Sequence, residues 1–241
     1  MQPRTPLHYG EAKFCLQHKI PVLCEKPLCL NAAECEDLVR TAKENNTFLM
    51  EGMWIRFLPF ICKAQMLINE NLLGDLLTVF ASMNYKAPYD PGSRYFNPAL
   101  GGGSLLDLGA YPVFLSALFL GKPEQICASA TLTDQGVDKI CSAILKYNSG
   151  AHAIIESSLI KNSDMPALIT GTRGWMKIVH PWFEKSPGLQ VELYTGEKYN
   201  FPFSWEGHGL HFESGKCWIA WTRGKWRAAE CRIISAWLLP L

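Results

Sequence analysis

Two short segments of the sequence contain residue types that can move protons at a hydroxyl group. The first is Glu25-Lys26-Pro27, which directly follows the apolar run of residues 20–24. In open α/β sheets the carboxyl ends of the strands face the ligand crevice. A lysine there can donate hydrogen bonds and positive charge to a substrate hydroxyl, and Pro27 fixes the turn that aims it. The simpler alternative for so short a motif is a surface lysine in a strand-to-loop turn.

The second segment begins at a triple glycine, residues 101–103, and continues through Asp107 and Tyr111 into an apolar stretch that ends at Leu120. If a helix begins near Ser104, Asp107 and Tyr111 are four residues apart and project from one face. A phenol on that face can transfer a proton while a carboxylate orients it. The structural alternative is an aspartate that stabilises the helix dipole beside a tyrosine packed in the core. Both interpretations stay open at this point.

Helix and strand alternate twice in the N-terminal part of the chain. Helical apolar spacing over 10–18 leads into a strand-like run over 20–24. Asn31, with Glu34 three residues later, predicts the N-cap of a helix that ends near Lys43, and a second strand-like run covers 47–50. This alternation predicts a parallel α/β sheet with Lys26 at the end of a strand.

The rest of the chain predicts a second, mostly antiparallel sheet. A helix over 57–70, a strand over 76–85 and a Pro- and Gly-rich loop over 87–103 come first. Strand-like runs follow, with turns at 148–150 and 172–174, over residues 126–132, 140–147, 152–159, 167–170, 175–179 and 189–194. The predicted fold class is α/β plus α+β: a partial Rossmann-like domain followed by a large, mostly antiparallel open sheet flanked by helices.

Composition and charge favour a globular protein with a small-molecule ligand. Of the 241 residues, 48% are hydrophobic and 19% are charged, and the net charge is only +1. With no long basic run and no uninterrupted apolar span, we expect neither a nucleic-acid partner nor a membrane. The nine cysteines form no C-x-x-C pair, a usage typical of the reducing cytosol, and we therefore expect a cytoplasmic protein. No residue spacing predicts a metal site.

The two segments together resemble the signatures of a known enzyme family. An E-K-P motif after a strand, followed by G-G-G-x-L-x-D-x-G-x-Y-P, resembles the Gfo/Idh/MocA family of NAD(P)-dependent oxidoreductases. Tyr111 stands where many members have histidine, which makes the chain similar to the dihydrodiol dehydrogenase and D-xylose dehydrogenase branch. The resemblance runs from about His8 to Glu213.

The resemblance implies hydride transfer between a nicotinamide and a sugar, polyol or diol hydroxyl carbon. Tyr111 would be the general acid/base, Lys26 would hold the hydroxyl and favour the phenolate form, and Asp107 would support both. The cofactor would be NADP or NAD, and the predicted cofactor-binding residues are His8, Glu25, Lys26 and Pro27. Trp54 and Arg94 are the predicted substrate residues, against the alternatives of a core tryptophan and a solvated arginine. An exposed position at a helix entry is the alternative for His8.

The family pattern also implies boundaries and a partner. We expect residues 1–52 to be a remnant of the dinucleotide-binding Rossmann domain and residues 53–213 to be an α+β substrate and dimerisation domain. Related enzymes often associate through this face, so we expect a homodimer whose interface is the sheet from Ile126 to Phe203. No G-x-G-x-x-G turn is present, so we expect an N-terminally truncated chain that binds NAD(P)H weakly or not at all and whose hydride transfer is impaired.

Residues 214–241 depart from the family pattern, which continues with an amphipathic helix and a Gly-x-x-Glu-Ser segment. The chain instead has a tryptophan-rich basic stretch. If the third base of each codon is joined to the first two bases of the next, the shifted frame, carried through Arg227, can encode Lys-Gly-Lys-Val-Glu-Ser, as the family pattern would require. We therefore expect an aberrant, out-of-frame tail. Two alternatives to an active dehydrogenase remain: a non-catalytic remnant that dimerises or binds carbohydrate, and a NAD-dependent glycosidase.

Overall fold

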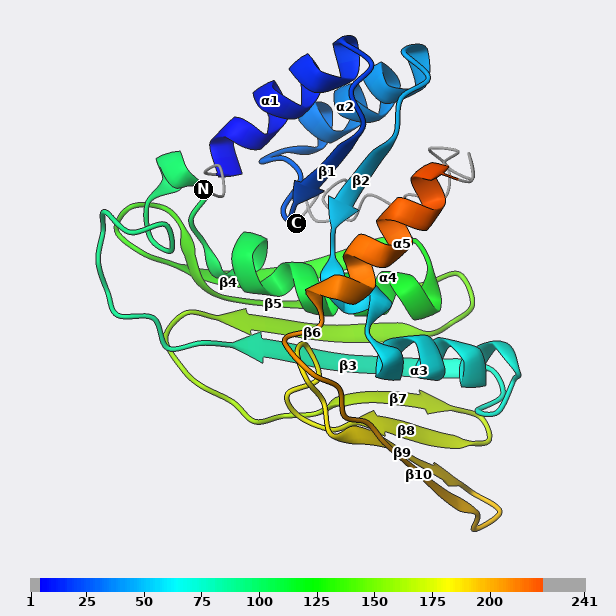
Figure 1. Cartoon of the computed structure of the whole chain (residues 1–241). Helices are drawn as coiled ribbons and strands as arrows, with labels where there is room; N and C mark the ends of the chain where they lie inside the picture. The colour runs from blue at the N-terminus through cyan, green and yellow to red at the C-terminus, as the bar shows by residue number, and fades with distance from the viewer. Residues whose placement is uncertain (1–4, 223–241) are drawn as a thin grey trace.

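The N-terminal part of the chain forms a small parallel α/β unit. The computed structural model describes residues 5–222, and Figure 1 shows its elements. The unit consists of α1 (Thr5–Gln17), β1 (Val22–Glu25), α2 (Ala32–Glu44) and β2 (Leu49–Gly52). β1 and β2 pair in parallel, and both helices lie on one side of them (Figure 1). The predicted alternation of helix and strand is confirmed, although each strand begins two residues later than predicted.

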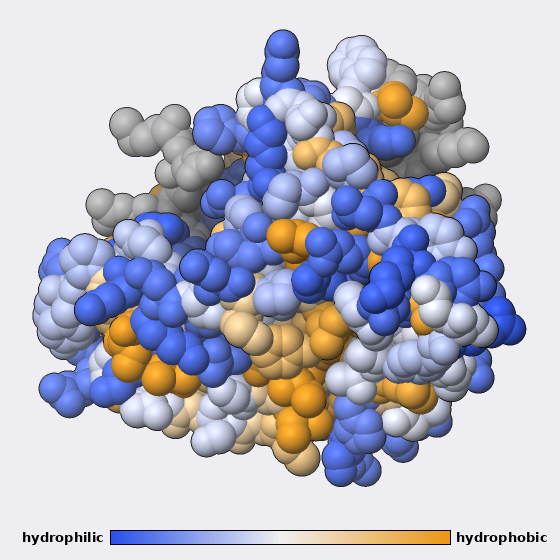
Figure 2. Space-filling model, turned by 90° about the horizontal axis from the view of Figure 1, so that it is seen from below, coloured by the Kyte–Doolittle hydropathy of each residue, from blue (hydrophilic) through white to orange (hydrophobic). Residues whose placement is uncertain are grey.

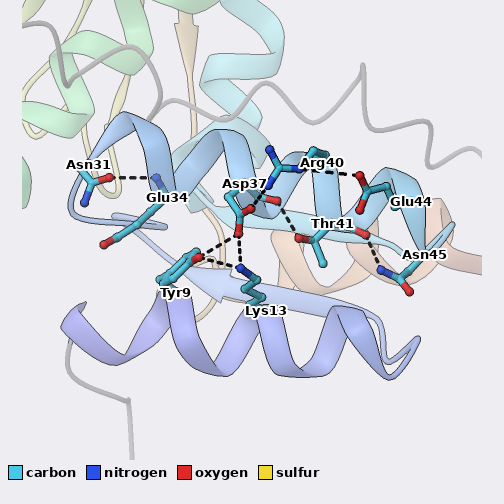
Figure 3. Close-up of polar contacts among 9 residues, drawn as sticks. All are labelled: Tyr9, Lys13, Asn31, Glu34, Asp37, Arg40, Thr41, Glu44 and Asn45. Atoms are coloured by element: carbon cyan, nitrogen blue, oxygen red, sulfur yellow. Dashed lines mark hydrogen bonds and ion pairs between the residues drawn. The ribbon is translucent and has the colours of Figure 1, made fainter.

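Polar contacts between α1 and α2 supplement the apolar packing of this unit. Asp37 of α2 receives a hydrogen bond from Tyr9 at 2.9 Å and an ion pair from Lys13 at 2.7 Å, as Figure 3 shows. The predicted N-cap is confirmed, because the Asn31 side chain accepts a hydrogen bond from the Glu34 backbone N–H at 2.9 Å. The buried apolar residues beneath these contacts include Leu16, Leu28, Cys29, Cys35 and Leu38.

The second part is built on an eight-stranded sheet with the order β10-β9-β8-β7-β3-β6-β5-β4. All neighbours are antiparallel except β3 and β6, which are parallel. The strand bounds are β3 (Leu76–Asn84), β4 (Gln125–Leu132), β5 (Asp138–Lys146), β6 (His152–Ser158), β7 (Ala167–Gly171), β8 (Gly174–Ile178), β9 (Gly188–Leu193) and β10 (Lys198–Pro202). The mostly antiparallel sheet was predicted, and the fold class is confirmed.

Helices cover one face of this sheet and leave the other face open (Figure 1). They are α3 (Pro59–Asn69), α4 (Ala110–Leu120) and α5 (Leu210–Thr222), with shorter turns η1 (Trp54–Phe57), η2 (Pro98–Leu100) and the π-helical η3 (Leu105–Gly109). α4 is the central core helix, since every residue from Ala110 to Ala117 is buried. The run Pro98–Leu120 is long and apolar enough to cross a membrane by length and composition, but 67% of its apolar 18-residue stretch is buried inside the protein, as in the core helix of a globular protein.

The structure differs from the sequence prediction in three places. The helix predicted over 57–70 is divided, because Leu58 is extended before Pro59 and the α-helix begins at the proline. β10 was not predicted. α5 continues to Thr222, so the first residues of the expected aberrant tail are helical, and the expected boundary at residue 213 falls inside a helix. The remainder of the expected tail, residues 223–241, lies outside the described part of the chain.

Candidate active site

A polar cleft of about 730 Å³ lies between the small α/β unit and the start of the helix that continues as α4. Its walls come from the end of β1, the start of α1, the loop before η2 and the turn η3. The lining residues are Thr5, His8, Glu25, Lys26, Pro27, Gly92, Arg94, Leu100, Gly101, Leu106, Asp107 and Tyr111. The cleft therefore brings together all three predicted catalytic residues and every predicted cofactor residue.

Lys26 and Asp107 form the central polar contact of the cleft. Lys26 Nζ donates to the backbone oxygen of Asp107 at 2.5 Å and lies 3.3 Å from its carboxylate Oδ1. Both side chains are nearly buried, with 13% and 15% of their surfaces exposed. An ion pair with so little solvent around it is held more firmly than one on the surface. Lys26 is thus fixed at the end of β1, and the surface-lysine alternative is wrong.

Tyr111 completes the arrangement on the next turn of the helix. Its ring centroid lies 4.7 Å from Lys26 Nζ, a distance typical of a cation–π contact. Its hydroxyl accepts a hydrogen bond from Trp54 Nε1 at 3.2 Å. Because the phenol oxygen can still donate its own proton, it is held in place and remains free to react. Trp54 is therefore joined to the site, rather than being only a core residue.

Arg94 closes the solvent side of the cleft. Its Nη1 lies 3.1 Å from Asp107 Oδ1, and its guanidinium stacks on Tyr95 at 4.4 Å. The side chain is 64% exposed, so the contact adds little stability by itself. The same carboxylate oxygen of Asp107 therefore faces two cations, Lys26 from inside and Arg94 from the solvent side.

His8 and Glu51 support the Glu25-Lys26-Pro27 turn from below. His8 Nδ1 donates to the Pro27 carbonyl at 2.9 Å, and Glu51 accepts a hydrogen bond from the Leu28 N–H at 3.0 Å. His8 is only 3% exposed, so the exposed helix-entry alternative is wrong. Glu51 was missed from the sequence, although its place at the end of β2 beside β1 was an available signal.

The arrangement is suited to proton transfer at a bound hydroxyl. A phenol sits beside an ammonium, the ammonium is oriented by a carboxylate, and an indole fixes the phenol oxygen. A substrate hydroxyl in the cleft could receive hydrogen bonds from Lys26 and exchange its proton with Tyr111. The fold and this site together define a two-part class of protein, in which part of a nucleotide-binding type of α/β unit is joined to an open-sheet domain that supplies the tyrosine and the aspartate of the cleft.

Comparison with known proteins agrees with that class. Residues 2–53 match the domain description "Oxidoreductase family, NAD-binding Rossmann fold", and residues 61–177 match "GFO/IDH/MocA C-terminal domain". The chain belongs to the Gfo/Idh/MocA family of oxidoreductases, as its motifs predicted.

The chain is similar to curated proteins named trans-1,2-dihydrobenzene-1,2-diol dehydrogenase. The *Xenopus laevis* protein is 34% identical over 87% of this chain and 64% of its own length. The *Mus musculus* protein is 35% identical over 89% of this chain and 63% of its own length. Across the curated relatives compared, the chain spans between 52% and 64% of the relative's length.

Solved structures share the fold at lower sequence identity. The aldose-aldose oxidoreductase from *Caulobacter crescentus*, complexed with glycerol, has a TM-score of 0.85 at 23% identity, covering 97% of this chain and 72% of that one. The 3-ketoreductase KijD10 from *Actinomadura kijaniata*, complexed with NADP and TDP-benzene, has a TM-score of 0.82 at 21% identity, covering 98% and 73%. These similarities show the fold.

Proposed function

We propose that the cleft serves hydride transfer between a nicotinamide cofactor and the hydroxyl-bearing carbon of a diol, sugar or polyol. The observation that carries the proposal is the position of Lys26, whose ammonium lies between the Asp107 carboxylate and the ring of Tyr111. A lysine and a tyrosine fixed side by side in a polar cleft suit the removal of a hydroxyl proton while the carbon loses hydride.

A small polyhydroxylated substrate fits the chemistry of the cleft walls. Donors from Lys26 and Arg94 and the acceptor of Glu25 line the cleft and can bind several hydroxyl groups. Trp54 is not one of the lining residues but adjoins the cleft through its hydrogen bond to Tyr111, and in this proposal its ring packs against the carbon skeleton of the substrate. Relatives named for dihydrobenzene-diol oxidation and a neighbouring structure complexed with glycerol support this substrate class.

The residues of the cleft fit the nicotinamide end of NAD or NADP. The match of residues 2–53 to a NAD-binding domain and the NADP-complexed neighbour support a cofactor of this kind. Thr5, His8 and the 25–27 turn line the cleft at the carboxyl end of β1, where open α/β sheets hold their ligands. When bound there, the nicotinamide would accept or supply the hydride.

The free thiols of the eight cysteines in the described region are in keeping with a cytosolic site of action.

The side chains of the cleft and Trp54 each have a role in binding or proton transfer. Lys26 donates to the substrate oxygen and stabilises negative charge on it, because Asp107 holds the ammonium in one place. Tyr111 takes up or returns the hydroxyl proton, and Trp54 keeps the phenol oxygen aimed into the cleft. Arg94 covers the solvent side of the carboxylate.

The test is label transfer with the chain as it stands. A diol or aldose deuterated at the hydroxyl-bearing carbon is incubated with the protein and saturating NAD⁺ or NADP⁺. We expect deuterium in the reduced nicotinamide and a ketone or lactone product. Saturable sugar binding without any transfer would contradict the proposal and favour a carbohydrate-binding remnant. In a parallel incubation with a glycoside, hydrolysis without net reduced cofactor would favour a glycosidase.

We also propose that the protein associates as a homodimer through the open face of the large sheet. Ile144, Ile154, Phe80 and Leu168 form one cross-strand row on β5, β6, β3 and β7. Ile144 and Ile154 are 43% and 42% exposed, and Figure 2, the view from below, shows apolar surface gathered in the middle of the molecule. Contiguous apolar surface of this kind marks protein interfaces.

A further inference from the structure

The first turn of the helix that carries Asp107 and Tyr111 is capped by a residue far away in the sequence. Asp138, the first residue of β5, accepts hydrogen bonds through Oδ2 from Ser104 Oγ at 2.6 Å and from the Leu105 N–H at 2.8 Å. The Ser104 side chain makes no cap of its own to the helix backbone. Asp138 therefore satisfies donors that a helix start leaves open and adds the negative charge that this end favours.

The backbone approaches Asp138 so closely that only glycine fits beside it. Gly103 has φ +121°, and a Cβ at this position would lie 2.3 Å from Asp138 Oδ1. The third glycine of the 101–103 run is thus explained by packing against Asp138 as well as by its backbone conformation. The carboxylate of Asp138 can reach the start of the helix only because residue 103 has no side chain.

Ser157 of β6 lies close to both ends of the same turn. Ser157 of β6 places its Oγ 2.9 Å from Ser104 Oγ, and a Cβ on Gly109 would lie 3.1 Å from it. Ser104 and Ser157 are both essentially inaccessible to solvent. The π-helical turn η3 (Leu105–Gly109) is therefore capped at its start by β5 and β6 and packs closely against β6 at its end. π-Turns recur at functional sites because they displace one residue from the regular helix.

Asp107 lies in the middle of this held turn. Its backbone oxygen and its carboxylate both contact Lys26, so a shift of the turn would move both contacts together. Asp138 itself does not line the active-site cleft. It lines a separate cavity of about 450 Å³, whose other walls include Leu30, Leu105, Ala130 and Val137.

We infer that Asp138 is a positioning residue: by capping the η3 turn it sets the place of Asp107, and through Asp107 it holds Lys26 in the cleft. The inference rests on the proposed function only in taking Lys26 and Asp107 as working residues. It predicts that loss of the Asp138 carboxylate releases Lys26 while the rest of the protein stays folded.

The experiment measures acetylation of individual lysines by acetic anhydride, with peptide mass spectrometry, in the wild type and in Asp138→Ala. Lys26 labelling should rise about fivefold or more in the variant, as expected when hydrogen bonds that close a local structure are lost. Lys13, paired with Asp37 between α1 and α2 (Figure 3), reports global loosening and should not change. Asp134→Ala, an exposed residue in the same β4–β5 hairpin, is the matched control.

Added formate should restore protection of Lys26 in Asp138→Ala, because the adjoining cavity gives a small carboxylate access to the vacated place. Ser104→Ala removes one of the two donors and should produce a smaller rise in Lys26 labelling. It replaces Asp138→Ala as the test variant if the latter does not fold. Unchanged Lys26 labelling in a folded variant, a parallel rise at Lys13, or a rise that formate does not reverse would overturn the inference.

These outcomes are distinct from those of the proposed function, because lysine labelling needs no turnover. A protein without hydride transfer, but with formate-reversible release of Lys26, would contradict the proposed function and support the role of Asp138. An active protein in which Asp138→Ala leaves the labelling of Lys26 unchanged would support the proposed function and contradict the role of Asp138.

Discussion

Lys26 donates to the backbone oxygen of Asp107 at 2.5 Å, across the boundary between the α/β unit and the turn that leads into the core helix of the large sheet. The contact joins the end of β1 to the η3 turn and fixes the ammonium over the ring of Tyr111. A charge held this way needs little reorganisation when negative charge develops on a substrate oxygen.

Replacement of Lys26 tests this arrangement. Lys26→Met keeps most of the side-chain volume and removes the charge, so kcat should fall about 10²-fold or more with little change in fold. Lys26→Arg keeps the charge but not the compact ammonium, and should recover only part of the rate. Steady-state kinetics give the result, with the exposed Lys198→Met as control. A fully active Lys26→Met enzyme would remove Lys26 from the mechanism.

Trp54 has two separable contributions, an N–H donor to the Tyr111 hydroxyl and an aromatic surface. Trp54→Phe removes the donor alone, so kcat should fall about tenfold with a small change in KM. Trp54→Ala also removes the surface and should raise KM about tenfold more. A wild-type kcat in Trp54→Phe would show that the hydrogen bond is irrelevant to turnover, and equal KM values for the two variants would show that the aromatic surface is irrelevant to substrate binding. Trp175→Phe, on the open face of the sheet, is the control.

Glu213 predicts a pH dependence of stability. Burial, with a smaller contribution from Glu25, raises the pKa of this carboxyl to about 7, and one of its oxygens has no hydrogen-bond partner. A raised pKa means that the folded state binds the proton more tightly than the unfolded state. The stabilisation is therefore largest in acid and is lost as pH rises from the ordinary glutamate range to about 7.

Glu213→Gln should remove this penalty. At pH ~8 we expect the variant to be more stable than the wild type by up to about 3 kcal/mol, and the difference should shrink toward pH ~5. Thermal unfolding across this range, with exposed Glu206→Gln as control, gives the comparison. A constant difference at all pH values would show that Glu213 does not titrate in this interval.

The proposed dimer depends on the apolar row of the open sheet face. Ile154→Lys places a charge in the middle of that row, between Ile144 and Phe80, and should convert a dimer to a monomer. Sedimentation velocity distinguishes the two states. Phe14→Lys, at another exposed apolar position, on α1 and away from the sheet, should leave the association unchanged. A wild-type protein that sediments as a folded monomer would contradict the dimer.

The sequence was sufficient to predict the convergence of Lys26, Asp107 and Tyr111. Strand-end placement of Lys26 and the helical spacing of the other two are local signals, and parallel α/β geometry brings strand ends to one crevice. Arg94 had no such signal, because its contact with Asp107 depends on the path of a long loop.

Other features depend on contacts that local sequence does not encode. β10 contains lysine, asparagine and proline and lies at the sheet edge, so it lacks the alternation that marks a half-buried strand. The π-helical turn and the cap at Asp138 arise from a residue more than thirty positions away from Ser104. The parallel pairing of β3 with β6 likewise arises from tertiary packing rather than from the pattern of either strand.

Replacement of Tyr111 tests most directly whether the cleft is a dehydrogenase active site. Tyr111→Phe removes one oxygen from a residue that is 8% exposed, leaving its ring beside Lys26. Tyr199→Phe removes the same atom at the exposed edge strand and is the matched control. The measurement is the rate of nicotinamide reduction as a function of pH with a saturating diol substrate. We predict that kcat of Tyr111→Phe falls about 10²-fold or more and loses the wild-type pH dependence, while Tyr199→Phe behaves as wild type. An unchanged kcat and pH profile in Tyr111→Phe would contradict the assignment of this cleft as a dehydrogenase active site.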